Sequence, residues 1–160
     1  MRNPKYRNLS IEELQTLEKE FIEFLVVNGL TGMDWEKLKK EQPEEAEAIV
    51  IQFSDVVFEG IMRKVKFLEY VSEKHIYCFQ CLDDQLVLVC AEASDVEHAN
   101  FRDPEFYKKA LLGKENKVYV FTEIKKYNLV RELELFDMIQ KGCQITEGEL
   151  FKQLSMALEN

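Results

Sequence analysis

The first part of the chain carries apolar residues at helical spacing. Ser10 and Glu13 form an S-x-x-E capping box, in which each side chain satisfies a backbone N–H of the other residue. The apolar face of the helix that follows comprises Ile11, Leu14, Leu17, Phe21, Phe24 and Leu25. Asn28-Gly29 ends this helix, because glycine takes the left-handed conformation of a helix C-terminus without steric cost. A short helix over 31–40 follows.

A longer helix begins at Pro43, where the missing N–H of proline does no harm. Its predicted buried stripe comprises Ala46, Ile49, Val50, Phe53, Val57, Ile61 and Val65. Gly60 lies inside this helix and costs about 1 kcal/mol relative to alanine. We expect the close approach of a neighbouring element to compensate for this glycine.

From residue 66 the apolar period changes from helical to alternating, which is typical of strands. The predicted strands are 66–71, 75–82, 86–92 and 117–124. A polar turn at Asp83-Asp84 joins the second strand to the third as a hairpin, and a helix begins at Asp103-Pro104. Asn128 is predicted to cap a further helix, and a second capping box, Thr146-x-x-Glu149, to start the last one.

This order of elements predicts an α+β fold with a small four-stranded, mostly antiparallel sheet and helices packed against it. The 160 residues suit one domain, 1–160. Within it we expect a helical part over 9–65, a sheet with one inserted helix over 66–124, and C-terminal helices over 128–158.

Acidic residues outnumber basic ones, 30 to 21, for a formal charge of -9. The negative electrostatic potential of such a chain repels a phosphate backbone, so nucleic-acid binding is disfavoured. No apolar run approaches the roughly 20 residues of a membrane span, and the first residues lack the apolar core of a secretory signal. We therefore expect a cytoplasmic protein with reduced thiols and no membrane contact.

The stretch HIYCFQCLDDQLVLVC, residues 75–90, concentrates histidine and cysteine. Its spacing suggests a set of zinc ligands, His75, Cys78, Cys81 and Cys90. The alternation of side chains along a strand disfavours such a zinc site, because Cys78 would face away from His75 and Cys81. A two-residue turn would place Cys81 opposite Leu86, Cys90 opposite Tyr77 and His75 opposite Glu92. We favour core cysteines and no cofactor, with zinc as the alternative, which requires a strand break at Phe79-Gln80.

The order helix, three strands, helix, strand over 43–124 resembles the core of the PD-(D/E)xK nuclease superfamily. That resemblance implies an aspartate on the second strand and an acidic-x-Lys motif on the third. The hairpin offers Asp83 or Asp84 and then Glu92-Ala93-Ser94, without the lysine. Glu123-Ile124-Lys125 carries such a triplet on another strand. A degenerate nuclease-like domain is therefore an alternative function, implied by this resemblance.

No P-loop, dinucleotide-binding, serine-nucleophile or zinc-protease motif is present, so an enzyme is disfavoured. Trp35 follows a turn and is a candidate partner anchor, because tryptophan is enriched at binding hot spots. The alternative is a packing role between the first helices. We therefore favour a non-enzymatic binding or adaptor protein that contacts a protein partner or a second copy of itself as a homodimer.

Several segments resemble a family of small uncharacterised bacterial proteins. They are KYRNLSIEEL, EKEFIEFLVVNGLTGMDWEKLK, FSDVVFEGIMRKVKFLEY and QITEGELFKQL. The resemblance runs from Lys5 to about Leu154 and implies a shared architecture in a bacterial cytoplasmic protein. It implies no activity, cofactor or catalytic residue.

Overall fold

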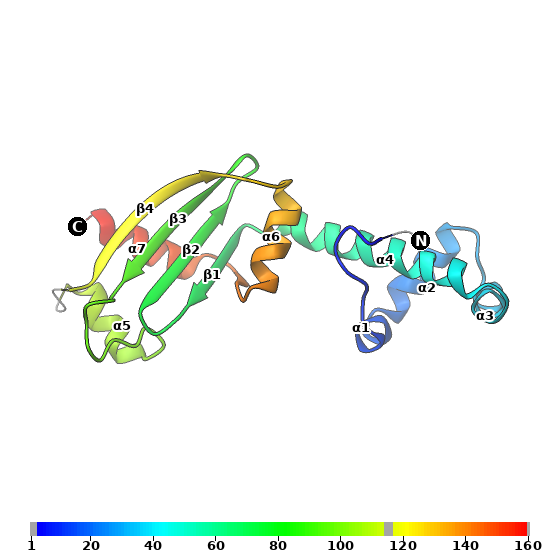
Figure 1. Cartoon of the computed structure of the whole chain (residues 1–160), viewed down its shortest axis with the longest axis horizontal. Helices are drawn as coiled ribbons and strands as arrows, with labels where there is room; N and C mark the ends of the chain where they lie inside the picture. Colours follow the sequence, from blue (N-terminus) through cyan, green and yellow to red (C-terminus); the bar gives the residue numbers. More distant parts are fainter. Residues whose placement is uncertain (1–2, 114–116, 160) are drawn as a thin grey trace. The chain divides into compact units, whose positions relative to one another are not determined.

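The computed structural model describes residues 3–113 and 117–159. The chain divides into two compact units, residues 1–63 and residues 64–160, which we call the helical unit and the sheet unit (Figure 1). The organisation of 1–160 as one domain stays a prediction.

The helical unit contains α1 (Ile11–Thr16), α2 (Glu18–Val27), α3 (Gly32–Glu41) and α4 (Pro43–Lys64), the last of which ends at the unit boundary. The capping box of Ser10 and Glu13 forms as predicted. The single helix expected after it is instead two, because Leu17 ends α1 and caps α2 with a non-helical backbone at φ -102° and ψ 23°. The amide hydrogen bonds from Leu17 to Glu13 and from Phe21 to Leu17 continue across this point, so the apolar period is not interrupted.

Aromatic side chains from α2 and α4 form the centre of the helical unit. The Phe53 ring of α4 lies 5.0 Å from the Phe21 ring and 5.4 Å from the Phe24 ring, both of α2. Leu25 and Ile51 are also buried. Two expectations for this unit are wrong: Ile61 of the predicted stripe is exposed, and no described residue outside the surrounding helix backbone lies within 4 Å of a Cβ atom built at Gly60.

The sheet unit confirms the α+β class with one strand more than predicted. Its strands are β1 (Phe67–Val71), β2 (His75–Cys81), β3 (Gln85–Glu92), β4 (Tyr119–Lys126) and β5 (Gln144–Thr146). They lie in the order β4-β3-β2-β1-β5, and every neighbouring pair is antiparallel. Its helices are α5 (Pro104–Leu111), α6 (Arg131–Gln140) and α7 (Glu149–Glu159).

The second predicted capping box is wrong, because its residues form β5 and the turn after it. Thr146 pairs with Phe67 at the end of β5, and its hydroxyl accepts a hydrogen bond from the Gly148 N–H at 3.2 Å. Gly148 has φ +86°, and α7 begins at the next residue. A strand of three residues is too short to show alternation, so it left no pattern in the sequence.

The predicted cap of α6 is also wrong. The N-cap residue is Val130, not Asn128. A carboxylate oxygen of Glu134 accepts hydrogen bonds from the backbone N–H groups of Asn128 at 2.7 Å and of Leu129 at 3.3 Å. The start of α6 is therefore stabilised by a buried acidic side chain from within the helix.

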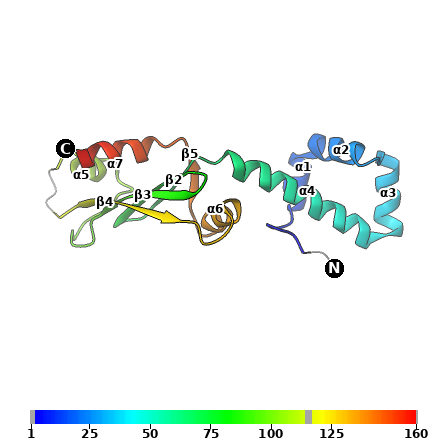
Figure 2. The ribbon, with the colours of Figure 1, turned by 90° about the horizontal axis from the view of Figure 1, so that it is seen from above.

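Helices α7 and α6 lie on opposite faces of the sheet (Figure 2). We call these the α7 face and the α6 face. The main hydrophobic core lies on the α7 face, where Ile76, Cys78 and Val89 pack with Leu154 of α7. The α6 face contains Leu68, Cys81 and Leu86, all buried, and also exposed aromatic side chains at Tyr70, Tyr119 and Phe121.

Candidate functional site

The hairpin of β2 and β3 has the register predicted from its turn. Cys81 pairs with Leu86, Cys90 with Tyr77, and His75 with Glu92. The His75 Nε2 lies 3.6 Å from the Glu92 carboxylate, and the imidazole stacks on the Tyr77 ring at 5.4 Å with an interplanar angle of 6°. His75 thus lies on the α6 face of the sheet, where it stacks on Tyr77 and lies next to Glu92.

The four predicted zinc ligands do not come together. β2 runs without a break through Phe79 and Gln80, so Cys78 lies on the α7 face while Cys81 lies on the α6 face. Among residues 3–113 and 117–159, no group of three or more His, Cys, Asp or Glu side chains is arranged to hold a metal ion. A zinc site on this hairpin would require the strand break that the structure lacks.

The cysteine thiols of the hairpin are buried and poorly suited to react. Desolvation raises the pKa of Cys78 and of Cys81 to about 12, and that of Cys90 to about 11. The thiolate is the form that attacks electrophiles and binds metals. These side chains therefore pack as protonated small hydrophobes, as the sequence pattern favours.

The acidic residues of the nuclease hypothesis lie far apart. Asp83 and Asp84 lie in the turn before β3, and Glu92 is the last residue of that strand. Seven residue steps at ~3.3 Å separate the two ends of β3 by about 23 Å. Lys125 pairs with Leu86, near the turn and away from Glu92. The described residues therefore show no convergence of Asp83 or Asp84 with Glu92 and a lysine.

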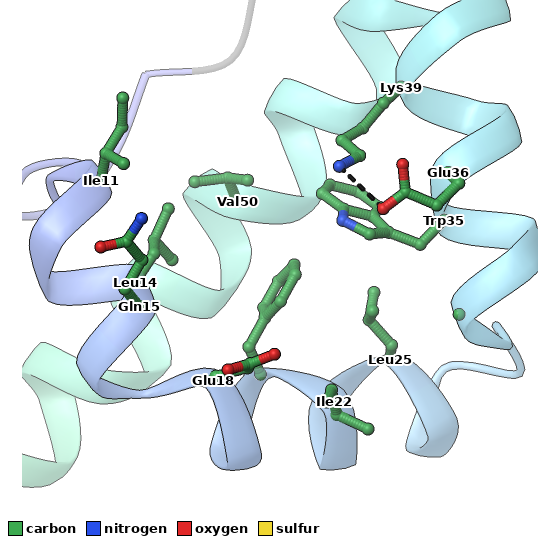
Figure 3. A pocket seen from close by; sticks show the side chains of 12 residues that line it. Ile11, Leu14, Gln15, Glu18, Ile22, Leu25, Trp35, Glu36, Lys39 and Val50 are labelled. Carbon is green, nitrogen blue, oxygen red and sulfur yellow. Dashed lines mark ion pairs between the residues drawn. The ribbon is translucent and has the colours of Figure 1, made fainter.

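A concave surface lies in the helical unit. It is a groove of about 1050 Å³ (Figure 3). All four helices of the unit contribute to its lining, which comprises Ile11, Leu14 and Gln15 of α1; Glu18, Phe21, Ile22 and Leu25 of α2; Gly32, Trp35, Glu36 and Lys39 of α3; and Val50 of α4. Its wall is predominantly aliphatic and aromatic, which is typical of ligand- and peptide-binding surfaces.

Trp35 is half-buried at this groove. Its indole ring meets the Phe21 ring edge to face at 5.1 Å, which fixes it against α2. The Lys39 ammonium group lies 5.7 Å from the indole centroid and 3.0 Å from the Glu36 carboxylate (Figure 3). Trp35 thus packs between helices and also borders the groove. Its role as a partner anchor stays a prediction.

Two isoleucines on the groove are more exposed than their hydrophobicity would suggest. Ile11, which the sequence places on the inward face, is 72% exposed, and Ile22 is 52% exposed. Sequence reasoning missed Ile22. The available signal was that apolar residues of α2 extend beyond one stripe, since Ile22, Val26 and Val27 lie outside the predicted face.

Comparison with known proteins places the chain in a family. The model of the DUF6495 family, described as a family of unknown function, matches residues 1–159. The chain belongs to the DUF6495 family. Neither a curated protein nor a solved structure matches it. In the described part of the chain, no helix of this DUF6495 member has the length and apolar character needed to cross a membrane.

Proposed function

We propose that the protein is a non-enzymatic binding protein of the bacterial cytoplasm that receives an amphipathic helix of a partner protein in the groove of its helical unit. The observation that carries this proposal is the groove itself, with its apolar wall and its single tryptophan. The zinc module and the nuclease-like domain are not proposed, because each needs a convergence of side chains that the described residues do not provide.

The apolar lining of the groove suits a helix as occupant. A helix presents apolar side chains at positions i, i+3, i+4 and i+7, and such a stripe can pack into an apolar groove between helices. Ile11 and Ile22 would lose their exposed surface on binding. Each square ångström of apolar surface removed from water contributes roughly 25 cal/mol before the entropic cost of association is subtracted.

Charge at the groove favours a basic partner. Glu18 and Glu36 line it, and the one lysine of the lining, Lys39, is paired with Glu36. Acidic residues also outnumber basic ones in residues 1–63 as a whole. A partner helix with Lys or Arg beside its apolar stripe would therefore associate faster and in a preferred orientation.

Fluorescence of Trp35 tests this proposal directly, because it is the only tryptophan of the chain. The probes are three 18-residue peptides: an amphipathic helix of Leu and Lys, the same helix with Glu in place of Lys, and a scrambled Leu/Lys sequence without a stripe. We expect the basic amphipathic peptide to shift the Trp35 emission in a saturable titration of the full chain. The acidic and scrambled peptides should bind at least about tenfold more weakly.

A pair of variants on α2 separates the groove from the rest of the helix surface. Ile22→Asp places a charge in the groove lining and should abolish the titration. Val27→Asp makes the same kind of change at a residue of α2 that is 84% exposed and outside the lining, so it should leave the titration unchanged. Equal binding of all three peptides, or equal loss in both variants, would contradict the proposal.

A further inference from the structure

The two edges of the five-stranded sheet differ in length. One edge is β5, which has three residues, and the other is β4, which has eight. Among the described residues, no strand pairs with the outer side of β4. Strand β4 therefore presents a long row of backbone N–H and C=O groups that have no partner strand, which is a template for pairing with another chain.

Apolar side chains along this edge are exposed as well. Tyr119 is 57% exposed and Ile124 is 66% exposed. Long, exposed edges of this kind are normally covered or blunted in natural proteins. On β4 the charged residues are confined to Glu123, Lys125 and Lys126, at the C-terminal end of the strand.

We propose that β4 pairs antiparallel with β4 of a second copy of this chain, with the two-fold axis passing between the two Ile124 residues. The triplet Glu123-Ile124-Lys125 is self-complementary in this register. Each Glu123 lies directly opposite the Lys125 of the other copy, and this pair occurs twice because the interface is isologous. The two five-stranded sheets then join into one sheet of ten strands.

Charge selects this register over its neighbours. Strands joined edge to edge about a two-fold axis must pair residues that lie on the same face, so the axis passes through a residue position of β4. An axis at Glu123 would place two glutamates directly opposite each other, and an axis at Lys125 would do the same with two lysines. Like charges directly opposite one another destabilise a sheet, and opposite charges stabilise it. The register centred on Ile124 is the one in which Glu123 faces Lys125.

The residues that make this contact have no competing partner within the described chain. Glu123 pairs with Leu88 and Lys125 with Leu86 across the β3–β4 ladder, and neither charged group forms an ion pair there. Pairing would also cover the exposed Ile124 side chains with each other. The inference does not rest on the proposed function, since it concerns the sheet unit and not the groove.

Analytical ultracentrifugation of the full chain over a range of concentrations tests this dimer. We expect a concentration-dependent monomer–dimer equilibrium. Glu123→Lys and Lys125→Glu should each raise the dissociation constant by about tenfold, because each places like charges opposite one another twice. The double variant with both changes should restore dimerisation. Lys126→Glu is the matched control, because Lys126 would face Thr122 of the second copy, and it should change dimerisation little.

A cysteine at the axis gives a second measurement. In the proposed register the two Ile124 Cα atoms lie about 4.5–5.5 Å apart, within reach of a disulfide. Ile124→Cys should therefore form a disulfide-linked dimer with oxidised glutathione. Thr122→Cys should not, because two such residues lie about 13 Å apart along the strands. The proposal would be overturned if the chain stayed monomeric at all concentrations. It would also be overturned if the wild type, the two charge variants and the double variant all dimerised with the same dissociation constant.

Discussion

The buried hydroxyl of Ser54 accepts a hydrogen bond from the backbone N–H of Leu9 at 2.9 Å. The same hydroxyl donates to the Val50 carbonyl at 2.7 Å, one turn earlier on α4. One small polar side chain therefore holds the segment before α1 against the long helix of the helical unit. Both partners are backbone groups, so the contact depends on the position of Ser54 and not on a particular side chain opposite it.

Ser54→Ala should destabilise the helical unit by about 1–3 kcal/mol, because it leaves the buried Leu9 N–H without an acceptor. Chemical unfolding followed by Trp35 fluorescence reports this unit specifically. Thr16→Ala is the matched control in the same unit, since the Thr16 hydroxyl also donates to a carbonyl one turn earlier in its helix, that of Glu12 at 3.0 Å. An equal effect of both variants would refute the role of the Leu9 contact.

Glu13 makes the stability of the helical unit depend on acid. The Arg7 guanidinium binds both carboxylate oxygens of Glu13, at 2.7 and 3.0 Å, and the Ser10 N–H binds one of them at 2.9 Å. The hydrogen bond from Arg7, then that from the Ser10 backbone, lowers the pKa of Glu13 from 4.5 to about 2. A lowered pKa in the folded state stabilises the fold above the unfolded value and loses that contribution as the pH falls toward the folded value.

We therefore expect the free energy of unfolding of the wild type to fall between about pH 4.5 and pH 2. In Glu13→Gln this fall should be smaller, because the variant lacks the carboxylate that becomes protonated. The gap in stability between the wild type and the variant should be largest above pH 5 and should narrow toward pH 2. Urea unfolding monitored through Trp35 at a series of pH values measures it. If the difference in unfolding free energy stayed constant over this range, protonation of Glu13 would not be coupled to folding.

Gly148 and Gly60 should respond in opposite ways to the same substitution. Gly148 has φ +86°, and a Cβ atom there would lie 2.6 Å from the Phe67 ring, so Gly148→Ala should destabilise the sheet unit by more than about 1 kcal/mol. Gly60→Ala adds a methyl group with no neighbour within 4 Å and should stabilise α4 by up to about 1 kcal/mol. Thermal unfolding by circular dichroism distinguishes the two signs, and destabilisation by both would be the contrary result.

The cysteines should differ in their reactivity toward a thiol reagent. Cys143 is half-buried, whereas Cys78, Cys81 and Cys90 are buried, and desolvation raises the pKa of all four thiols. We expect Cys143 to react first with Ellman's reagent and the other three to react mainly after unfolding.

Native mass spectrometry with and without a chelator checks the zinc alternative. One zinc per chain, with thiols released by the chelator, would require a rearranged hairpin.

The sequence determined those features that depend on neighbours along the chain. The capping box at Ser10 needs a partner three residues away, and the start of α4 needs only the fixed φ of Pro43. The hairpin register followed from the Asp83-Asp84 turn and the period of two along a strand, which also placed Cys78 opposite in direction to Cys81. These relations are local, so a single chain sequence contains them.

The tertiary structure decided what depends on distant residues. Whether Gln144–Thr146 forms a strand is settled by the edge of β1, nearly eighty residues earlier, because three residues have too little pattern of their own. The groove exists because α1, α2, α3 and α4 leave Ile11 and Ile22 partly uncovered, although their periodicity alone would bury Ile11. An apolar pattern indicates which side chains would lower the free energy by burial. The packing of elements that are distant in sequence determines which of those side chains are actually buried.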